Sequence, residues 1–241
     1  MAVSIALKIS LTAIAAVFHV SPDGSKIIVL GADGVDTITL GDDKERAFTG
    51  HGTNCKIGST DGFYYAMAGL SAGGPDSDYN AYKEMERALT TQGDFKARIT
   101  NLEAEILTTL NRLNAPSSDR RVEMLIIDSS TFPRYYLGVI DRDQNGQWSF
   151  RSSSGIRQGS PITDEFVGIG IGTRAAELQP RLMMDQANTI REMLRQEAVD
   201  RPGEVGEPFS IVRIANGQAQ WLEQGACGPN KKPVNDLQPK K

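Results

Sequence analysis

The sequence predicts an α+β fold, a four-layer αββα sandwich in which two antiparallel sheets are flanked by helices. Strand-like runs come before and after a pair of helical patterns, short turn signals join neighbouring strands, and a third helical pattern precedes a last hairpin. Helices that separate groups of hairpins are typical of α+β architectures. We expect residues 12–224 to form this domain and residues 1–11 to be a propeptide or leader. Residues 225–241 are polar, contain Pro and Lys, and predict a disordered tail.

The N-terminal part predicts a hairpin of two apolar strands, residues 13–20 and 26–32, joined by the turn signal SPDG. The first twenty residues also allow a poor signal peptide, with Lys8 as its charged residue. We favour the buried strand, because Lys8 follows an apolar stretch instead of opening the chain.

Three helices are predicted from apolar residues at helical spacing. Asp76 or Ser77 can cap the first helix and Asp94 the second. The apolar positions are Tyr79, Tyr82, Met85 and Leu89 in the first helix, Phe95, Ile99, Leu102, Ile106 and Leu110 in the second, and Met183, Ala187, Ile190, Leu194 and Ala198 in the third. Each set makes one apolar face that can cover a sheet.

The other strands are predicted from short apolar runs bounded by turn residues. Residues 33–54 are polar and rich in glycine, and they predict a loop or a short outer strand. The remaining predicted strands cover residues 55–59, 62–68, 122–128, 134–141, 147–151, 166–172, 209–214 and 220–222.

Composition argues against several classes of partner. The net charge of −4 is spread along the chain, and no basic stripe predicts a nucleic-acid partner. The N-terminal apolar part is too short to span a bilayer, so no membrane partner is expected. Cys55 and Cys227 allow one disulfide, but two free thiols in a reducing compartment are the favoured interpretation. We therefore expect a cytoplasmic location.

No metal and no cofactor are expected. The run from Asp141 to Gly146 resembles the opening of a calcium loop, but Ser152 stands where the twelfth, acidic ligand is required. His51 and Cys55 alone do not make a zinc site.

Four strings, taken in order, resemble the proteasome β-subunit family and its bacterial heat-shock protease relative, within the N-terminal nucleophile hydrolases. They are VLGADG (29–34), NCKIGSTDGFYYAMAGLSAGG (54–74), EFVGIGIGTRAAE (165–177) and VDRPGEVGEPFSIVRI (199–214). The resemblance implies an αββα sandwich and a threonine-type amide hydrolase, a peptidase subunit of a homo-oligomeric ring. Its substrates would be peptides or other amides, and an ATPase partner is left open.

The resemblance also implies roles for four residues. Thr12 matches the nucleophile, whose hydroxyl attacks the amide carbonyl while its own α-amino group acts as base. Lys56 matches the lysine that lowers the pKa of this amine and hydroxyl, and Asp33 the aspartate that orients the lysine. Gly69 matches the glycine whose backbone N–H stabilises the oxyanion. The predicted hairpin agrees, because it brings Asp33 near Thr12.

Other positions depart from the family's pattern. Leu11 stands where the family commonly has the glycine that precedes the nucleophile. Ile171, Pro202 and Val205 stand where serine, aspartate and serine help to orient the threonine. Thr12 is also internal, so eleven residues must be removed before its amine exists. These departures support a second hypothesis, a catalytically inactive member of the fold with an assembly or binding role.

Overall fold

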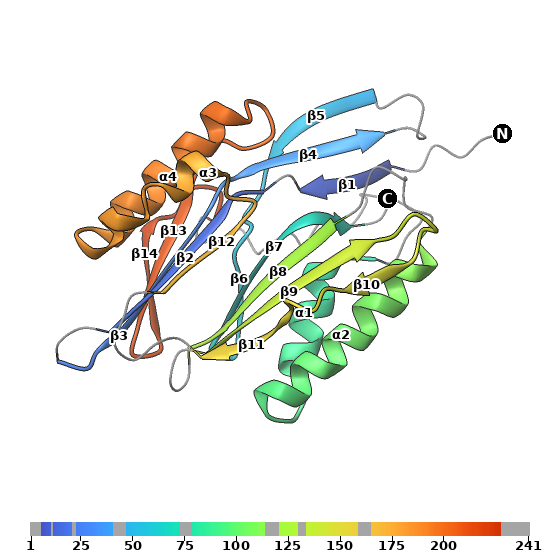
Figure 1. Cartoon of the computed structure of the whole chain (residues 1–241), viewed down its shortest axis with the longest axis horizontal. Coiled ribbons are helices and arrows are strands. Elements are labelled where there is room, and N and C mark those ends of the chain that lie inside the picture. The colour runs from blue at the N-terminus through green and yellow to red at the C-terminus, as the bar shows by residue number, and fades with distance from the viewer. Residues whose placement is uncertain are drawn as a thin grey trace.

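The chain of 241 residues folds into two antiparallel sheets with helices on their outer faces, as predicted (Figure 1). The structure, a computed structural model, describes residues 6–10, 12–20, 23–40, 47–72, 79–113, 121–129, 134–158 and 165–227. Within these ranges the α+β class and the sandwich of layers are confirmed. No described helix is both long enough and apolar enough to cross a membrane.

The larger sheet has nine strands in the described residues, in the order β10-β9-β8-β7-β1-β4-β5, with β11 paired to β9 and β6 to β7. Its strands are β1 (Ala6–Ser10), β4 (Val35–Leu40), β5 (Ala47–Thr53), β6 (Gly58–Thr60), β7 (Phe63–Ala72), β8 (Arg121–Asp128), β9 (Arg134–Arg142), β10 (Trp148–Phe150) and β11 (Gly155–Gln158). The described strand pairs are antiparallel throughout this sheet.

The smaller sheet has five strands in the order β12-β2-β3-β13-β14, also antiparallel. These are β2 (Ile14–Val20), β3 (Lys26–Ala32), β12 (Glu165–Ile169), β13 (Ser210–Ala215) and β14 (Gln218–Glu223). The predicted N-terminal hairpin is therefore confirmed as β2 and β3. The chain passes from β1 in the larger sheet directly to β2 in the smaller one.

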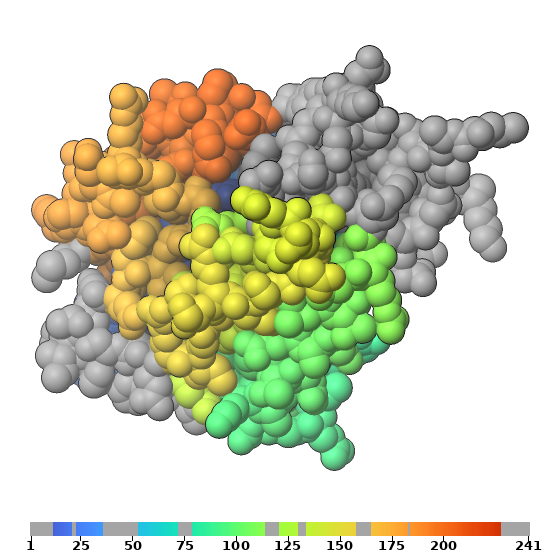
Figure 2. All heavy atoms as spheres, turned by 45° about the vertical axis from the view of Figure 1, so that its right-hand side comes forward, coloured from blue at the N-terminus to red at the C-terminus, as the bar shows by residue number. Residues whose placement is uncertain are grey.

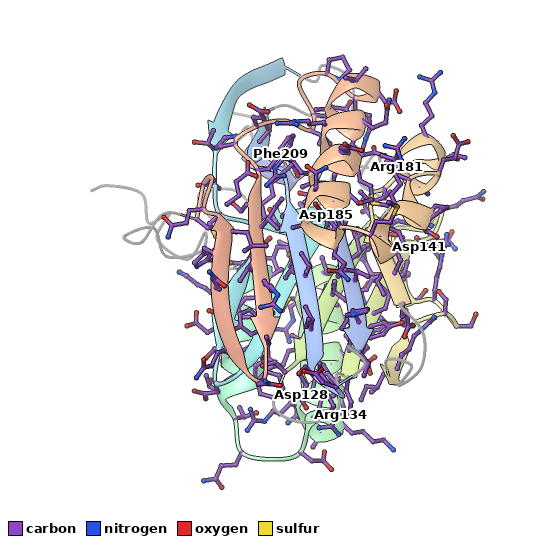
Figure 3. All side chains as sticks on the ribbon, turned by 90° about the vertical axis from the view of Figure 1, so that its left-hand side faces the viewer. Asp128, Arg134, Asp141, Arg181, Asp185 and Phe209 are labelled. Atoms are coloured by element: carbon purple, nitrogen blue, oxygen red, sulfur yellow. A yellow bond between two sulfur atoms is a disulfide. The ribbon has the colours of Figure 1, made fainter. Side chains whose placement is uncertain are left out.

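Helices cover the outer face of each sheet. Helices α1 (Ala81–Thr90) and α2 (Phe95–Arg112) pack on the larger sheet, and α3 (Thr173–Ala176), the 3-10 helix η1 (Gln179–Met183) and α4 (Gln186–Asp200) pack on the smaller one. In Figure 2 the orange helix α4 and the green helix α2 lie at opposite ends of the molecule, with yellow residues of β9 to β11 between them. Figure 3 shows Asp185 at the start of α4 and Phe209 near its other end.

Three apolar cores hold the four layers together. Strand β2 contributes to two of them, because its side chains alternate between the faces of the sheet. Ile14 and Phe18 pack between the two sheets, whereas Ala15 and Val17 pack under α4. The third core lies between the larger sheet and α1 and α2, and it contains the apolar stripe predicted for the second helix. Burial on both faces explains why residues 14–18 of β2 are all apolar.

The local predictions are correct for α2 and need correction at three other places. Asp94 caps α2 by accepting a hydrogen bond from the backbone N–H of Ala97 at 2.8 Å. Helix α1 is capped by Asn80, not by Asp76 or Ser77, which lie outside the described residues. Residues 33–54, predicted as a loop or a short outer strand, contain two paired strands, β4 and β5. The third helix begins at residue 186, and short α3 and η1 precede it.

The two cysteines form a disulfide, and the prediction of two free thiols is wrong. Cys55 and Cys227 are 172 positions apart in the sequence, and their Cα atoms lie 4.5 Å apart. Both are buried between the sheets, where sequence spacing gives no sign that they meet. Ala226 is buried as well, so the described fold continues past residue 224. Residues 228–241 of the predicted tail lie outside the described residues.

Candidate functional site

The candidate site is built around Asp33, at the end of the β2–β3 hairpin. Ile14 pairs with Ala32, the last residue of β3, so Asp33, which follows that strand, comes to lie beside Ala13. The backbone N–H of Asp33 donates to the carbonyl of Ala13 at 3.1 Å. The Asp33 side chain also binds Ala13, because Oδ1 accepts from the Ala13 N–H at 2.9 Å. Its other oxygen, Oδ2, accepts from the Val35 N–H at 3.1 Å. The hairpin therefore holds the carboxylate next to the start of β2.

Lys56 forms a buried ion pair with this carboxylate. Its Nζ lies 3.1 Å from both Oδ1 and Oδ2, and the side chains of Lys56 and Asp33 are 1% and 0% exposed. Burial raises the pKa of the Asp33 carboxyl, while the Lys56 ammonium and the two backbone N–H donors oppose that shift. A buried pair of this kind needs every partner, since an unpaired charge in the interior is costly.

The backbone around Lys56 is held at three points. The hydroxyl of Tyr82 in α1 donates to the Lys56 carbonyl at 3.0 Å. The N–H of Asn54 donates to the carbonyl of Gly34 at 2.9 Å, next to Asp33 in the chain. Cys55, directly before the lysine, is tied to the C-terminal part of the chain by the disulfide. These contacts fix the backbone from which the Lys56 side chain reaches Asp33.

Thr12 lies in the connection between β1 and β2, and it is 1% exposed. The next residue, Ala13, donates to the same Asp33 oxygen that accepts from Lys56 Nζ. The structure thus brings the predicted nucleophile, aspartate and lysine to one place. In the uncleaved chain, however, the nitrogen of Thr12 is part of a peptide bond.

Gly69 lies in β7 beside the strand that leads to Thr12. It pairs with Ser10 of β1 on one side and with Val122 of β8 on the other. Its φ of +93° is in the region that favours glycine, and a Cβ would lie 2.2 Å from the carbonyl oxygen of Arg121. Thr12 thus lies in the segment between β1 and β2, with Gly69 paired to Ser10 before it and the Asp33–Lys56 pair bound to Ala13 after it.

Three of the positions that depart from the family's pattern lie in different surroundings, and the fourth, Leu11, lies outside the described residues. Val205 is buried in the apolar core under α4, and Pro202 is exposed. Ile171 packs at the edge of the same core. Sequence reasoning missed Glu197 and Arg201, which form an ion pair at the end of α4 and contact the turn before α3. Their spacing of four residues was the available signal, but such pairs are common on helix surfaces.

The described residues contain no group of three or more His, Cys, Asp or Glu side chains that could hold a metal ion. Cys55 is engaged in the disulfide and offers no thiolate. The four candidate residues supply a hydroxyl, a carboxylate, an ammonium and backbone N–H groups.

Comparisons with known proteins support the fold. No family model matches the chain, and no curated protein matches its sequence. The structure is similar to that of the Anbu (Gly-1) mutant from Hyphomicrobium sp. strain MC1, at 11% identity and a TM-score of 0.51, over 88% of this chain and 87% of that chain. It is also similar to Anbu (ancestral beta-subunit) from Yersinia bercovieri, at 13% identity and a TM-score of 0.48, with the same coverage. The first likeness shows that this chain shares its fold with Anbu.

Proposed function

We propose that the chain is a threonine-type amide hydrolase that acts on peptides after residues 1–11 are removed. Thr12 is the nucleophile and base, Lys56 lowers the pKa of its amine and hydroxyl, Asp33 orients the lysine, and Gly69 donates to the oxyanion. The observation that carries the proposal is the shared oxygen of Asp33. It accepts from Lys56 Nζ at 3.1 Å and from the N–H of the residue after Thr12 at 2.9 Å.

The charges at the site suit an amine that must act as a base near neutral pH. A free α-amino group has a pKa of about 7.7–8.0, so much of it is protonated at pH 7. A nearby ammonium disfavours a second positive charge and lowers that pKa. Lys56 Nζ lies 3.1 Å from the Asp33 carboxylate, so its ammonium is placed to supply this effect. The free amine of Thr12 would then be neutral and able to accept a proton.

The reaction follows in two steps. The Thr12 amine takes the proton of the Thr12 hydroxyl while Oγ forms a bond to the carbonyl carbon, and the oxyanion accepts a hydrogen bond from the Gly69 N–H. The C–N bond then breaks, and the leaving amine takes the proton, which leaves an ester on Thr12. In the second step the same amine takes a proton from water while the water oxygen forms a bond to the ester carbonyl carbon. The bond from that carbon to Thr12 Oγ then breaks, Oγ takes the proton back from the amine, and the acid is released.

The position of β1 supports a peptide as substrate. Residues 6–10 are paired on one side with β4 and on the other with β7, next to Gly69. Removal of residues 1–11 would leave the edges of β4 and β7 without this strand. An extended peptide can add to such edges through backbone hydrogen bonds.

Intact-mass measurement tests the proposal. The purified protein should lose the mass of residues 1–11, and the product should gain one adduct from a threonine-directed electrophile such as a β-lactone. Thr12→Ala should keep its full mass and give no adduct. Thr108→Ala, at an exposed position of α2, is the matched control and should behave as the wild type. A wild-type protein of full mass that gives no adduct would contradict the proposal.

A catalytically inactive protein with an assembly or binding role is the second candidate. Two observations favour it: β1 is an integral strand of the larger sheet, paired on both sides, and Leu11 replaces the family's glycine before the nucleophile. A full-length mass together with a defined complex would support this candidate.

The homo-oligomeric ring and the location are further parts of the proposal. The resemblance to the proteasome β-subunits supports a ring, which mass photometry of the purified protein would test. The cytoplasmic location stays a prediction, and the disulfide weighs against it because such bonds persist in oxidising compartments. Fractionation of the producing cells, with the thiol state read by alkylation and mass, separates these possibilities.

A further inference from the structure

A buried carboxylate and an arginine meet at the C-terminal end of α4. Glu197 Oε2 accepts from Arg201 Nε at 3.0 Å and from Nη2 at 2.7 Å, which is a two-point contact. The Glu197 side chain is 2% exposed and that of Arg201 28%. Ion pairs between helix residues four apart normally lie on the surface and contribute little. The burial of Glu197 therefore calls for a different explanation.

The same two side chains bind both ends of the turn that follows β12. The other oxygen of Glu197, Oε1, accepts a hydrogen bond from the backbone N–H of Gly172. Nη2 of Arg201 donates to the carbonyl of Gly170. The ion pair thus works as one unit, in which each partner satisfies the other and holds one end of residues 170–172.

This turn rests directly on Thr12. Ile169, the last residue of β12, pairs with Ile14, so the chain beyond it reaches the residue that precedes β2. Gly170 has a φ of +60°, and a Cβ there would lie 2.1 Å from the carbonyl oxygen of Thr12. Only a residue without a side chain fits this approach. The position of the Thr12 backbone therefore depends on the position of the turn at residues 170–172, which contacts it.

We propose that Glu197 and Arg201 are positioning residues for Thr12 and take over an orienting role from polar groups that the chain lacks. The family places serine, aspartate and serine where this chain has Ile171, Pro202 and Val205. Arg201 directly precedes Pro202, so the ion pair approaches the nucleophile from the region of the missing groups. The catalytic part of this inference rests on the proposed function, whereas the structural part does not.

Two variants and one control test the inference. Glu197→Gln keeps an acceptor for the Gly172 N–H but removes the charge that holds Arg201. Arg201→Lys keeps the charge but loses the two-point contact. Glu192→Gln is the control, because Glu192 lies on the same helix as Glu197 but forms an exposed ion pair, with Arg181 of η1.

Hydrogen exchange gives a readout that needs no activity. Amides of residues 12–16 should exchange at least tenfold faster in Glu197→Gln and more modestly faster in Arg201→Lys. Amides of α2, on the far sheet, report global stability and should keep the wild-type rate, as should all amides in Glu192→Gln. Unchanged exchange of residues 12–16 in both variants would overturn the inference. If Glu197→Gln does not fold, Arg201→Lys carries the measurement.

Kinetics of the processed enzyme test the catalytic part. For peptide hydrolysis, kcat should fall at least tenfold in Glu197→Gln with KM within twofold of wild type, because the orientation of Thr12 is disturbed and not the binding of the peptide. Faster exchange with unchanged kcat would reduce the pair to a structural role and overturn the proposal. A wild-type protein that neither loses residues 1–11 nor reacts with the electrophile would refute the proposed function instead, and exchange alone would then decide the positioning of Thr12.

Discussion

Replacing Lys56 with methionine tests whether the buried ion pair is a cooperative unit of the fold. The change leaves the Asp33 carboxylate buried, with two backbone N–H donors and no cation. Removing one partner of a buried pair costs about 3–5 kcal/mol of unfolding free energy. The two remaining donors favour the lower end of that range. For a domain of this size a loss of about 3 kcal/mol corresponds to a fall in melting temperature of roughly 6–12 °C.

Urea denaturation at pH 7, followed by circular dichroism and tryptophan fluorescence, measures this loss. The double variant Asp33→Asn, Lys56→Met buries no charge, and its new amide side chain would still accept from the Ala13 N–H. It should therefore recover at least about 1 kcal/mol relative to Lys56→Met alone. Arg87→Met is the control, because its ion pair with Glu105 is 63% and 41% exposed and contributes at most about 1 kcal/mol.

The pH dependence of Lys56→Met has a defined sign. Without the cation the pKa of Asp33 rises further above its unfolded value, so the folded state binds more protons than the unfolded state as pH falls. The deficit of the variant should therefore shrink between pH 7 and pH 5. Asp33→Asn alone completes the cycle. A loss below about 1 kcal/mol for Lys56→Met at pH 7, or losses of the two single variants that simply add in the double variant, would refute the view that the pair is a unit.

Three further predictions concern the rest of the fold. Cys227→Ala should lower the unfolding free energy by about 2–5 kcal/mol in urea, because the disulfide closes a long loop, and an unchanged midpoint would contradict this. Burial raises the pKa of Tyr79 and Tyr136, so both stay protonated in the folded state while unfolded tyrosine ionises near pH 10. Stability should therefore fall as pH rises above about 10, and full tyrosinate absorbance at 295 nm before unfolding would argue against it. Leu102→Ala, in the fully buried core under α2, should cost about 2–5 kcal/mol by denaturation, and a loss under about 1 kcal/mol would show that the core relaxes freely.

The helices and the N-terminal hairpin were predictable because their signals are local. The apolar stripe of α2 repeats at the helical period, and Asp94 stands directly before it, where a cap is needed. Strand β1 was not predictable in the same way. Residues 6–10 resemble the start of a leader, and they become a strand through pairing with β4 and β7, which are distant in sequence.

The candidate site likewise contains residues with a signal in the sequence and residues without one. Asp33 and Lys56 could be predicted because each stands in a string that resembles the family, and the hairpin brings Asp33 beside Ala13. Glu197 and Arg201 carry an ordinary helix pattern, and only the burial of Glu197 distinguishes them from a surface pair. The disulfide was missed because nothing in the sequence relates two cysteines that lie so far apart.

The bond between Cys55 and Cys227 also closes residues 55–227 into a covalent circle, which leaves residues 1–54 as an N-terminal arm and residues 228–241 as a C-terminal one. Lys56 belongs to the circle, together with the described helices, whereas Thr12 and Asp33 belong to the arm formed by the first 54 residues. A single cut anywhere in the circle would still leave one covalent molecule. A cut between Asp33 and Cys55 would leave the arm attached by noncovalent contacts alone: strand pairing, apolar packing and the ion pair of its carboxylate. The candidate site is thus assembled from both parts, because the ion pair joins Asp33 of the N-terminal arm to Lys56 of the circle.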